Sequence, residues 1–152
     1  MRKEYCKASK SLSLEEKNCK DYKLGSIYWV NLGQNEGHLQ GGWHPAVIVQ
    51  NNVGNKYSPT ISIVPITSSK TKSKLPTHVH IAAGKYGLTR DSIIQCEGQR
   101  PIDRSAIGSY IGALDEATMK QVAKGCLINT PFLFFLSDID IGAITQNERL
   151  VC

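Results

Sequence analysis

Residues 40–60 read QGGWHPAVIVQNNVGNKYSPT, and this stretch contains the clearest signal for the fold. From Pro45 the segment PAVIVQN is a continuous apolar run, and the edge of a strand tolerates a proline at its first position. The segment before it, 33–43, holds four glycines in eleven residues, and the segment after it, NNVGNKYSPT, is rich in turn-forming residues. The stretch therefore predicts a strand over 45–51 between two loops.

Short segments of β-branched and aromatic residues recur on both sides of this strand. They are SIYWVNL (26–32), TISIVPI (60–66), HVHIA (78–82), SIIQCE (92–97), a possible continuation over 98–102, and SYIGAL (109–114). Pro65 predicts an edge strand or a bulge within the second of these segments. A helix is predicted to follow, with Asp115 as its N-cap and Thr130-Pro131 as its stop. Many short strands and one late helix predict a mainly β fold, a small and strongly curved antiparallel barrel decorated with helices.

Length and charge predict one domain with extensions at both ends. The chain has 152 residues, with 18 Lys and Arg against 13 Asp and Glu, for a formal net charge of +5. The predicted division is a basic, polar extension over 1–23, the domain over 24–130, and an apolar, acidic tail over 131–152 that packs on the domain or on a dimer partner. No apolar run approaches the about 20 residues that span a membrane. The N-terminus also lacks the apolar stretch of a secretory signal, so we expect a cytoplasmic protein.

A family resemblance extends over roughly residues 24–128. In order, GSIYWVNL, QGGWHPAVIVQNNVGNKYSPT, VPIT, KLPTHV, KYGLTRDSIIQCEGQRPID and a helix that begins LDEA resemble the MazF/PemK toxins of bacterial toxin–antitoxin modules. The resemblance implies an SH3-like barrel that forms a homodimer. It also implies a sequence-specific endoribonuclease that needs no metal or other cofactor, and a cognate antitoxin that blocks the RNA groove. Such enzymes cut single-stranded RNA by attack of a 2′-hydroxyl, which leaves a 2′,3′-cyclic phosphate and a 5′-hydroxyl.

This chemistry needs a base for the 2′-hydroxyl, an acid for the 5′-oxygen, and donors for the charge on the phosphoryl oxygens. The resemblance assigns the catalytic positions to His44 and Thr67, and the Thr67 hydroxyl would donate to a phosphate oxygen. The family has an arginine where this chain has His44, directly before Pro45. Histidine exchanges protons near neutral pH but offers fewer donors than a guanidinium. His44 is therefore either an acid–base group in its own right or the mark of a weakened enzyme.

The resemblance also implies an RNA groove built from small and polar residues. Glycines would let RNA approach backbone N–H groups, lysines would bind phosphates, and polar side chains would bind base edges. The predicted RNA-binding residues are Gly41, Gly42, Asn51, Ser68, Lys70, Lys72, Lys74, Glu97, Gln99 and Arg100. Trp43 either stacks on a base, belongs to the core or covers the dimer seam. His38 is a further candidate for proton transfer if its loop folds back toward His44.

The sequence raises three alternatives to an endoribonuclease, which are a metal-binding protein, a toxin that binds DNA gyrase and a relative that only binds. His78 and His80 lie on one side of a predicted strand, but no third ligand is evident, so no metal site is predicted. CcdB-like toxins use the same barrel to bind DNA gyrase without cutting nucleic acid, although Thr67 and the QNNVGNKYSPT stretch favour the endoribonuclease. A catalytically weakened relative that binds only RNA or an antitoxin is the remaining alternative, and the histidine at position 44 is its basis.

Overall fold

The structure is a computed structural model that describes residues 21–34, 37–68 and 74–135. Its strands are β1 (Ser26–Asn31), β2 (Trp43–Ile48), β3 (Thr60–Thr67), β4 (His78–Ile81), β5 (Ser92–Gln95), β6 (Arg100–Asp103) and β7 (Ile107–Ala113). The helices are α1 (Asn52–Tyr57) and α2 (Glu116–Asn129), with the 3-10 turns η2 (Cys96–Gly98), η3 (Arg104–Ala106) and η4 (Phe132–Phe135). Most of the predicted extension and tail lies outside the described residues. Among the described helices, none is both long and apolar enough to cross a membrane.

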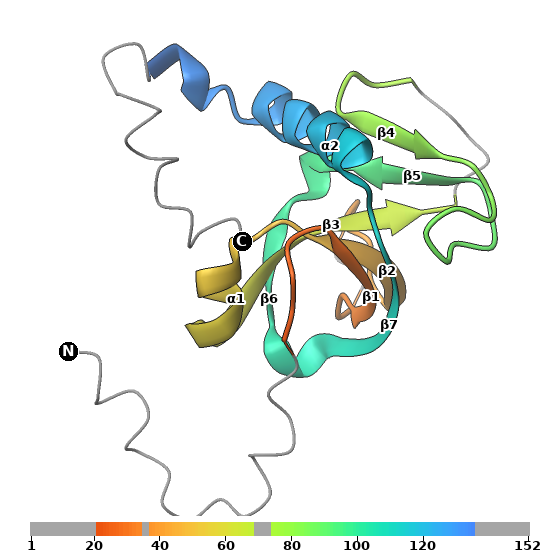
Figure 1. Ribbon diagram of the computed structural model, residues 1–152, viewed down its shortest axis with the longest axis vertical. Helices are drawn as coiled ribbons and strands as arrows, with labels where there is room; N and C mark the ends of the chain where they lie inside the picture. Colours follow the sequence, from red (N-terminus) through yellow and green to blue (C-terminus); the bar gives the residue numbers. More distant parts are fainter. Residues whose placement is uncertain (1–20, 35–36, 69–73, 136–152) are drawn as a thin grey trace, which may run out of the picture.

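The strands form a curved antiparallel sheet in the order β4-β5-β3-β2-β1-β7, and β6 also pairs with β3 (Figure 1). The predicted mainly β fold with a late helix is confirmed, but the predicted barrel does not close. Among the described strands, β4 and β7 form the two ends of the sheet and do not pair with each other. The loop over 82–91 lies between these ends, where Gly87 contacts Ile111 of β7. At this seam, between the loop over 82–91 and β7, contacts from the loop therefore take the place of a ladder of backbone hydrogen bonds.

Two hydrophobic clusters lie on opposite faces of the central strands. In β3, Ile61 and Ile63 belong to one cluster, whereas Val64 and Ile66 belong to the other. Because successive side chains of a strand point to opposite faces, a strand buried on both faces must be apolar along its length. This explains the continuous apolar runs in the sequence. Tyr22 is buried in one of the clusters, so the packed part of the chain includes a residue that the sequence assigned to the extension.

Pro65 lies inside β3 rather than on an edge strand. On one side, β3 pairs with β2 through Ala46 opposite Pro65. On the other side, its partner changes from β6, which pairs with 60–63, to β5, which pairs with 66–67. Gly98 packs on the proline ring at this change, where an added Cβ would come within 2.8 Å of the Pro65 Cγ atom. The missing backbone N–H of proline is tolerated at this junction because neither β5 nor β6 pairs with residue 65.

The predicted turn over 51–60 contains a short helix, α1. Its N-cap is Asn51, whose Oδ1 atom accepts a hydrogen bond of 2.8 Å from the backbone N–H of Gly54. Asn55 is buried within the helix, and its side-chain amide donates to the carbonyl of Gln50 at 2.9 Å. The asparagines that indicated a turn therefore cap and anchor a helix.

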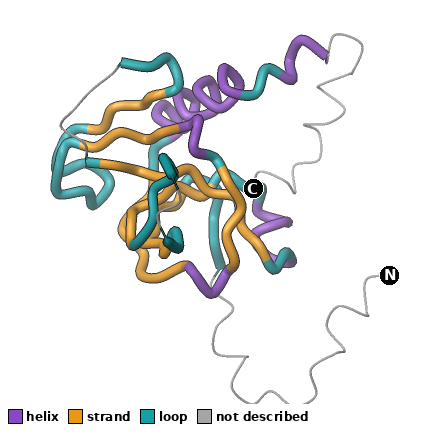
Figure 2. Tube along the Cα trace, turned by 180° about the vertical axis from the view of Figure 1, so that it is seen from behind, coloured by secondary structure: helices purple, strands orange, loops and turns teal. Residues whose placement is uncertain are grey.

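The late helix α2 lies against β4 and η2, and opposite views of the fold agree on this arrangement (Figures 1 and 2). The predicted N-cap is confirmed, because Asp115 accepts hydrogen bonds of 2.7 Å from the Thr118 backbone N–H and from the Tyr86 hydroxyl. Val122 anchors the helix in the core, and Thr130 is its C-cap, as predicted. The cap thus joins α2 to the loop over 82–91.

We expect the contribution of Asp115 to stability to depend on pH. Hydrogen bonds, first from Tyr86 and then from Thr118, lower the pKa of the Asp115 carboxyl from 3.8 to about 2. The ionised carboxylate stabilises the fold at neutral pH, and protonation removes that contribution as the pH falls from about 4 toward 2. Asp115→Asn should therefore unfold at a lower urea concentration than the parent protein at pH 7. The difference should shrink in acid, and a difference that stays constant down to pH 2.5 would contradict this assignment.

Candidate active site

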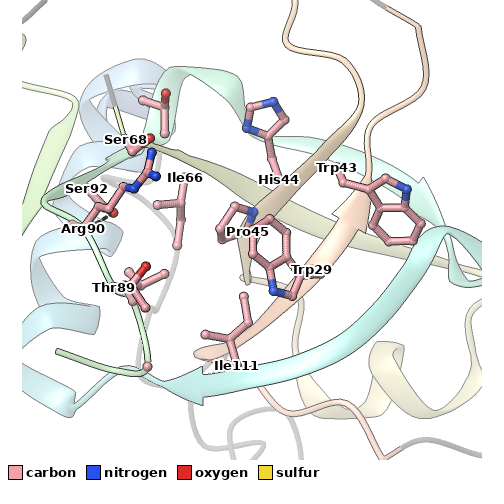
Figure 3. A pocket seen from close by; sticks show the side chains of 13 residues that line it. Trp29, Trp43, His44, Pro45, Ile66, Ser68, Thr89, Arg90, Ser92 and Ile111 are labelled. Atoms are coloured by element: carbon pink, nitrogen blue, oxygen red, sulfur yellow. Dashed lines mark hydrogen bonds between the residues drawn. The ribbon is translucent and has the colours of Figure 1, made fainter. Parts of the chain in front are cut away.

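A cavity of about 540 Å³ opens between the first residues of β2, the last residues of β3 and the loop over 82–91. Side chains from segments far apart in the sequence meet there. Figure 3 shows His44, Pro45 and Trp29 on one side, Arg90, Thr89 and Ser92 on the other, and Ile66 between them. The lining residues are Trp29, Trp43, His44, Pro45, Ile66, Thr67, Ser68, Gly87, Leu88, Thr89, Arg90, Ser92 and Ile111.

The two predicted catalytic residues both line this cavity. The backbone pairing of β2 with β3 ends with Ala46 opposite Pro65. The same register, continued by two residues, puts His44 opposite Thr67, and directly opposed residues of an antiparallel pair have Cβ atoms about 4.5–5.5 Å apart. Both residues are half-buried. The strand pairing therefore brings an imidazole and a hydroxyl to one rim of the cavity.

The polar groups that line the cavity are hydrogen-bond donors and a cation, without any acidic side chain. Hydroxyl groups come from Thr67, Ser68, Thr89 and Ser92, and none of the lining residues is a carboxylate. Arg90 is the one permanently charged side chain in the lining. Besides His44 and Gly87, the rest of the wall consists of apolar and aromatic side chains. Such a cavity suits an anionic group that accepts hydrogen bonds, next to a flat or apolar group.

Sequence reasoning missed Arg90, because GKYGLTRD (84–91) lies between two predicted strands and no candidate site residue was assigned to it. In the structure, Asp91 accepts a hydrogen bond of 2.9 Å from the Ala83 backbone N–H, which ties the two ends of this loop together. The neighbouring Arg90 then lines the cavity. The sequence did contain a signal for Arg90, which is a cation in a loop directly before a predicted strand. Functional side chains often lie on loops that rigid strands hold in place.

The glycine-rich connection between β1 and β2 lies beside the cavity without lining it. Gly42 has a left-handed φ of +76°, donates to the Gly33 carbonyl at 2.7 Å and accepts from the Leu32 N–H at 2.8 Å. Trp43 follows directly, and its ring covers Gly108 of β7, where an added Cβ would come within 2.9 Å of the ring. Gly41, the other glycine that was predicted to bind RNA, directly precedes Gly42. The connection therefore positions Trp43 at the cavity mouth.

Two tryptophan rings at the cavity remain open to solvent. Trp43 is 56% exposed and Trp29 is 42% exposed. Large exposed aromatic rings beside a polar cavity are typical stacking surfaces for unpaired bases. Trp43 thus covers a glycine of the sheet and still presents a free ring surface.

Other predicted RNA-binding residues lie elsewhere on the fold. Arg100 donates from its guanidinium to the Gln40 carbonyl at 2.8 Å, and so holds the β1–β2 connection against β6. Gln99 is exposed between η2 and β6. Asn51 caps α1, beyond the end of β2 that is opposite to His44. The structure does not bring these three residues into the cavity.

Glu97 lies on η2 and forms an ion pair of 2.8 Å with His78 of β4. The His78 side chain is only 6% exposed. Burial raises the pKa of Glu97, but hydrogen bonds from its backbone, Thr77 and His78 outweigh burial and lower it. Glu97 therefore supports the packing of η2 and is absent from the cavity lining. Within the described residues, no group of three His, Cys, Asp or Glu side chains could hold a metal ion.

The remaining candidates are spread over loops. Ser68, one of the predicted RNA-binding residues, lines the cavity. Lys74 is exposed and outside the lining, and Lys70 and Lys72 lie outside the described residues. His38 is exposed and does not line the cavity, so the structure does not place a second histidine next to His44.

A family model supports the assignment that the fold and the cavity suggest. The model of the PemK-like, MazF-like toxin of type II toxin–antitoxin systems matches residues 23–128. The chain belongs to this family, and the resemblance found in the sequence is confirmed.

Individual relatives agree with the family. The chain is 39% identical over 113 residues to Endoribonuclease EndoA of Bacillus subtilis, a match that covers 74% of this chain and 97% of the relative. It is 42% identical over 100 residues to Endoribonuclease MazF of Staphylococcus saprophyticus, which covers 66% and 83%. Among solved structures, an endoribonuclease in complex with its cognate antitoxin from a mycobacterial species has the same fold. It shows a TM-score of 0.60 at 23% identity, over 72% of this chain and 95% of that one.

Proposed function

We propose that this toxin is an endoribonuclease that cuts single-stranded RNA through the 2′-hydroxyl of its own substrate, without a metal or cofactor. The observation that carries the proposal is the cavity lined by both His44 and Thr67, in which a proton-transfer group adjoins hydroxyl donors. The names of the relatives, Endoribonuclease EndoA and Endoribonuclease MazF, support the same class of reaction.

In the proposed reaction, His44 accepts the proton of the 2′-hydroxyl. The freed 2′-oxygen attacks the adjacent phosphorus, and the bond from phosphorus to the 5′-oxygen breaks. Thr67 donates a hydrogen bond to a phosphoryl oxygen while negative charge develops there. The leaving oxygen takes a proton from the imidazolium or from solvent, and no water molecule is consumed. The products are a 2′,3′-cyclic phosphate and a 5′-hydroxyl.

The proposed RNA path begins at the cavity and continues over its surroundings. Ser68 donates to the phosphate, and the exposed rings of Trp29 and Trp43 stack on the flanking bases. The lysines around residues 70–74 bind more distant phosphates, which makes binding depend strongly on salt. The other predicted contacts, from Gly41, Gly42, Asn51, Glu97, Gln99 and Arg100, lie outside the cavity lining and would act only beyond the reacting phosphate.

The proposed partners are a cognate antitoxin and a second copy of the chain. The mycobacterial relative was solved with its cognate antitoxin, and an antitoxin segment bound over the cavity would exclude RNA. Homodimerisation and action in the cytoplasm complete the proposal, because single-stranded messenger RNA is exposed to the toxin there.

A cleavage assay with modified RNA tests the proposal. The purified chain is incubated, with EDTA present, with a single-stranded RNA that contains all short sequence words. We expect cuts that leave cyclic phosphate and 5′-hydroxyl ends. A second RNA with a 2′-deoxyribose immediately 5′ of the cut should bind with similar affinity and remain intact. Cleavage of the deoxy-substituted RNA, or salt-sensitive binding with no cleavage of either RNA, would contradict the reaction. The second result would instead favour the weakened, binding-only relative that the histidine at position 44 suggests.

A further inference from the structure

Arg90 is a cation in the cavity that the reaction described above does not use. It lies in the loop before β5, and Figure 3 shows it across the cavity from His44, beside Ser68. It is the one lysine or arginine among the lining residues. Any negative charge that develops in the cavity therefore has this guanidinium as its nearest permanent counter-charge within the lining.

The backbone of Arg90 is held in place while its head group stays available. The Ser92 hydroxyl donates to the Arg90 carbonyl at 2.8 Å, and Ser92 itself is buried. On the adjacent residue, the Asp91 carboxylate is engaged by the Ala83 N–H at 2.9 Å. None of the ion pairs among the described residues involves Arg90. The loop thus presents a positive charge that no carboxylate of the described residues neutralises through an ion pair.

We infer that Arg90 is a catalytic residue that binds the non-bridging oxygens of the scissile phosphate and stabilises their charge in the transition state. This inference rests on the proposed endoribonuclease activity. A guanidinium matches a phosphate with two parallel hydrogen bonds and stays charged throughout the working pH range. The other lining groups that face the phosphate are hydroxyls and an imidazole, which lack this combination. His44 therefore transfers the proton, and Arg90 stabilises the negative charge on the phosphate.

Cleavage kinetics of variants that remove or keep a positive charge test whether Arg90 stabilises the scissile phosphate. Arg90→Gln should lower kcat about 10²-fold or more with a smaller change in KM, as expected when a preorganised donor to the transition state is lost. Arg90→Lys should lose less, because it keeps the charge without the planar fork. Lys124→Gln is the control: it removes one positive charge from an exposed site on α2, outside the cavity lining, and should leave kcat unchanged.

Phosphorothioate RNA separates a phosphate contact from a structural role. Sulfur in place of one non-bridging oxygen of the scissile phosphate should slow the parent enzyme for one of the two diastereomers. The same substitution should have a smaller effect on Arg90→Gln, because the contact is already lost. If Arg90→Gln folds poorly, the same comparison is made between the parent enzyme and Arg90→Lys.

The outcomes distinguish the inference from the proposed function. If the parent protein cuts RNA and Arg90→Gln retains kcat within about threefold, or if the phosphorothioate effect is equal in both proteins, the role of Arg90 is overturned and the endoribonuclease proposal stands. If the parent protein does not cut RNA, both fail together.

Discussion

His44→Gln is expected to lower kcat for RNA cleavage by about 10²- to 10⁴-fold, with little change in KM, because general acid–base catalysis contributes about that much. Glutamine keeps polar atoms at the site but cannot accept the 2′-hydroxyl proton. His44 lines the cavity together with Thr67 and is only half-buried, so the loss concerns the reacting atoms rather than the fold. Single-turnover kinetics on a defined RNA measure the effect.

The same reasoning predicts a loss of activity for His44→Arg. A guanidinium binds phosphate well but holds its proton at any pH the protein tolerates, so it cannot replace the proton-transfer step. Single-turnover kinetics on the same defined RNA measure this loss.

His80→Gln is the matched control for position 44. His80 is an exposed histidine on β4, outside the lining of the cavity, and its replacement should leave kcat unchanged. A large gain of cleavage in His44→Arg would overturn the acid–base assignment, and would mean that histidine weakens an enzyme whose mechanism favours arginine at this position.

Local sequence patterns predicted the strands and α2, because burial selects apolar residues and helix capping selects particular polar residues at the positions concerned. The continuous apolar runs of β2 and β3 reflect burial on both faces, and Asp115 marks the start of α2 through its capping hydrogen bond. Pro65 was harder to interpret, since its tolerance depends on β3 changing partners from β6 to β5. That change is a property of strand order, which no local pattern encodes.

The candidate site was predictable only in part for the same reason. The family resemblance assigned His44 and Thr67 to one site, and in the structure both residues line the same cavity. Arg90 could not be placed, because its position depends on how the loop over 82–91 folds back against β7. Glu97 has the polarity of a base-reading residue, but its ion pair with His78 uses that polarity to pack η2.

The seam between that loop and β7 is the feature on which the cavity wall depends. Gly87 has a left-handed φ of +80°, and a Cβ atom there would overlap the carbonyl oxygen of Ile111. Gly112 makes the reciprocal approach, since its added Cβ would overlap the Tyr86 carbonyl oxygen. Backbone meets backbone at this point, so no side chain can move aside to relieve the contact. The seam therefore requires glycine for space as well as for conformation.

Gly87→Ala is accordingly expected to lower the free energy of unfolding by about 2–5 kcal/mol. A left-handed backbone costs an L-residue about 1–2 kcal/mol, and overpacking adds about 1–3 kcal/mol. Gly84→Ala is a close match in the same loop, because its φ of +84° carries similar strain while no atom lies within 4 Å of the added Cβ. It should cost only the about 1–2 kcal/mol of conformational strain.

Urea unfolding of the two variants and the parent measures both costs, and kinetics on the folded fraction extend the comparison to function. Any shift of Gly87 to relieve the overlap also moves Leu88, Thr89 and Arg90, which line the cavity. Gly87→Ala should therefore lose kcat beyond its loss of stability, whereas Gly84→Ala should retain kcat when folded. Equal destabilisation by the two substitutions would mean that the contact with Ile111 does not hold the loop, and that the cavity wall has another support.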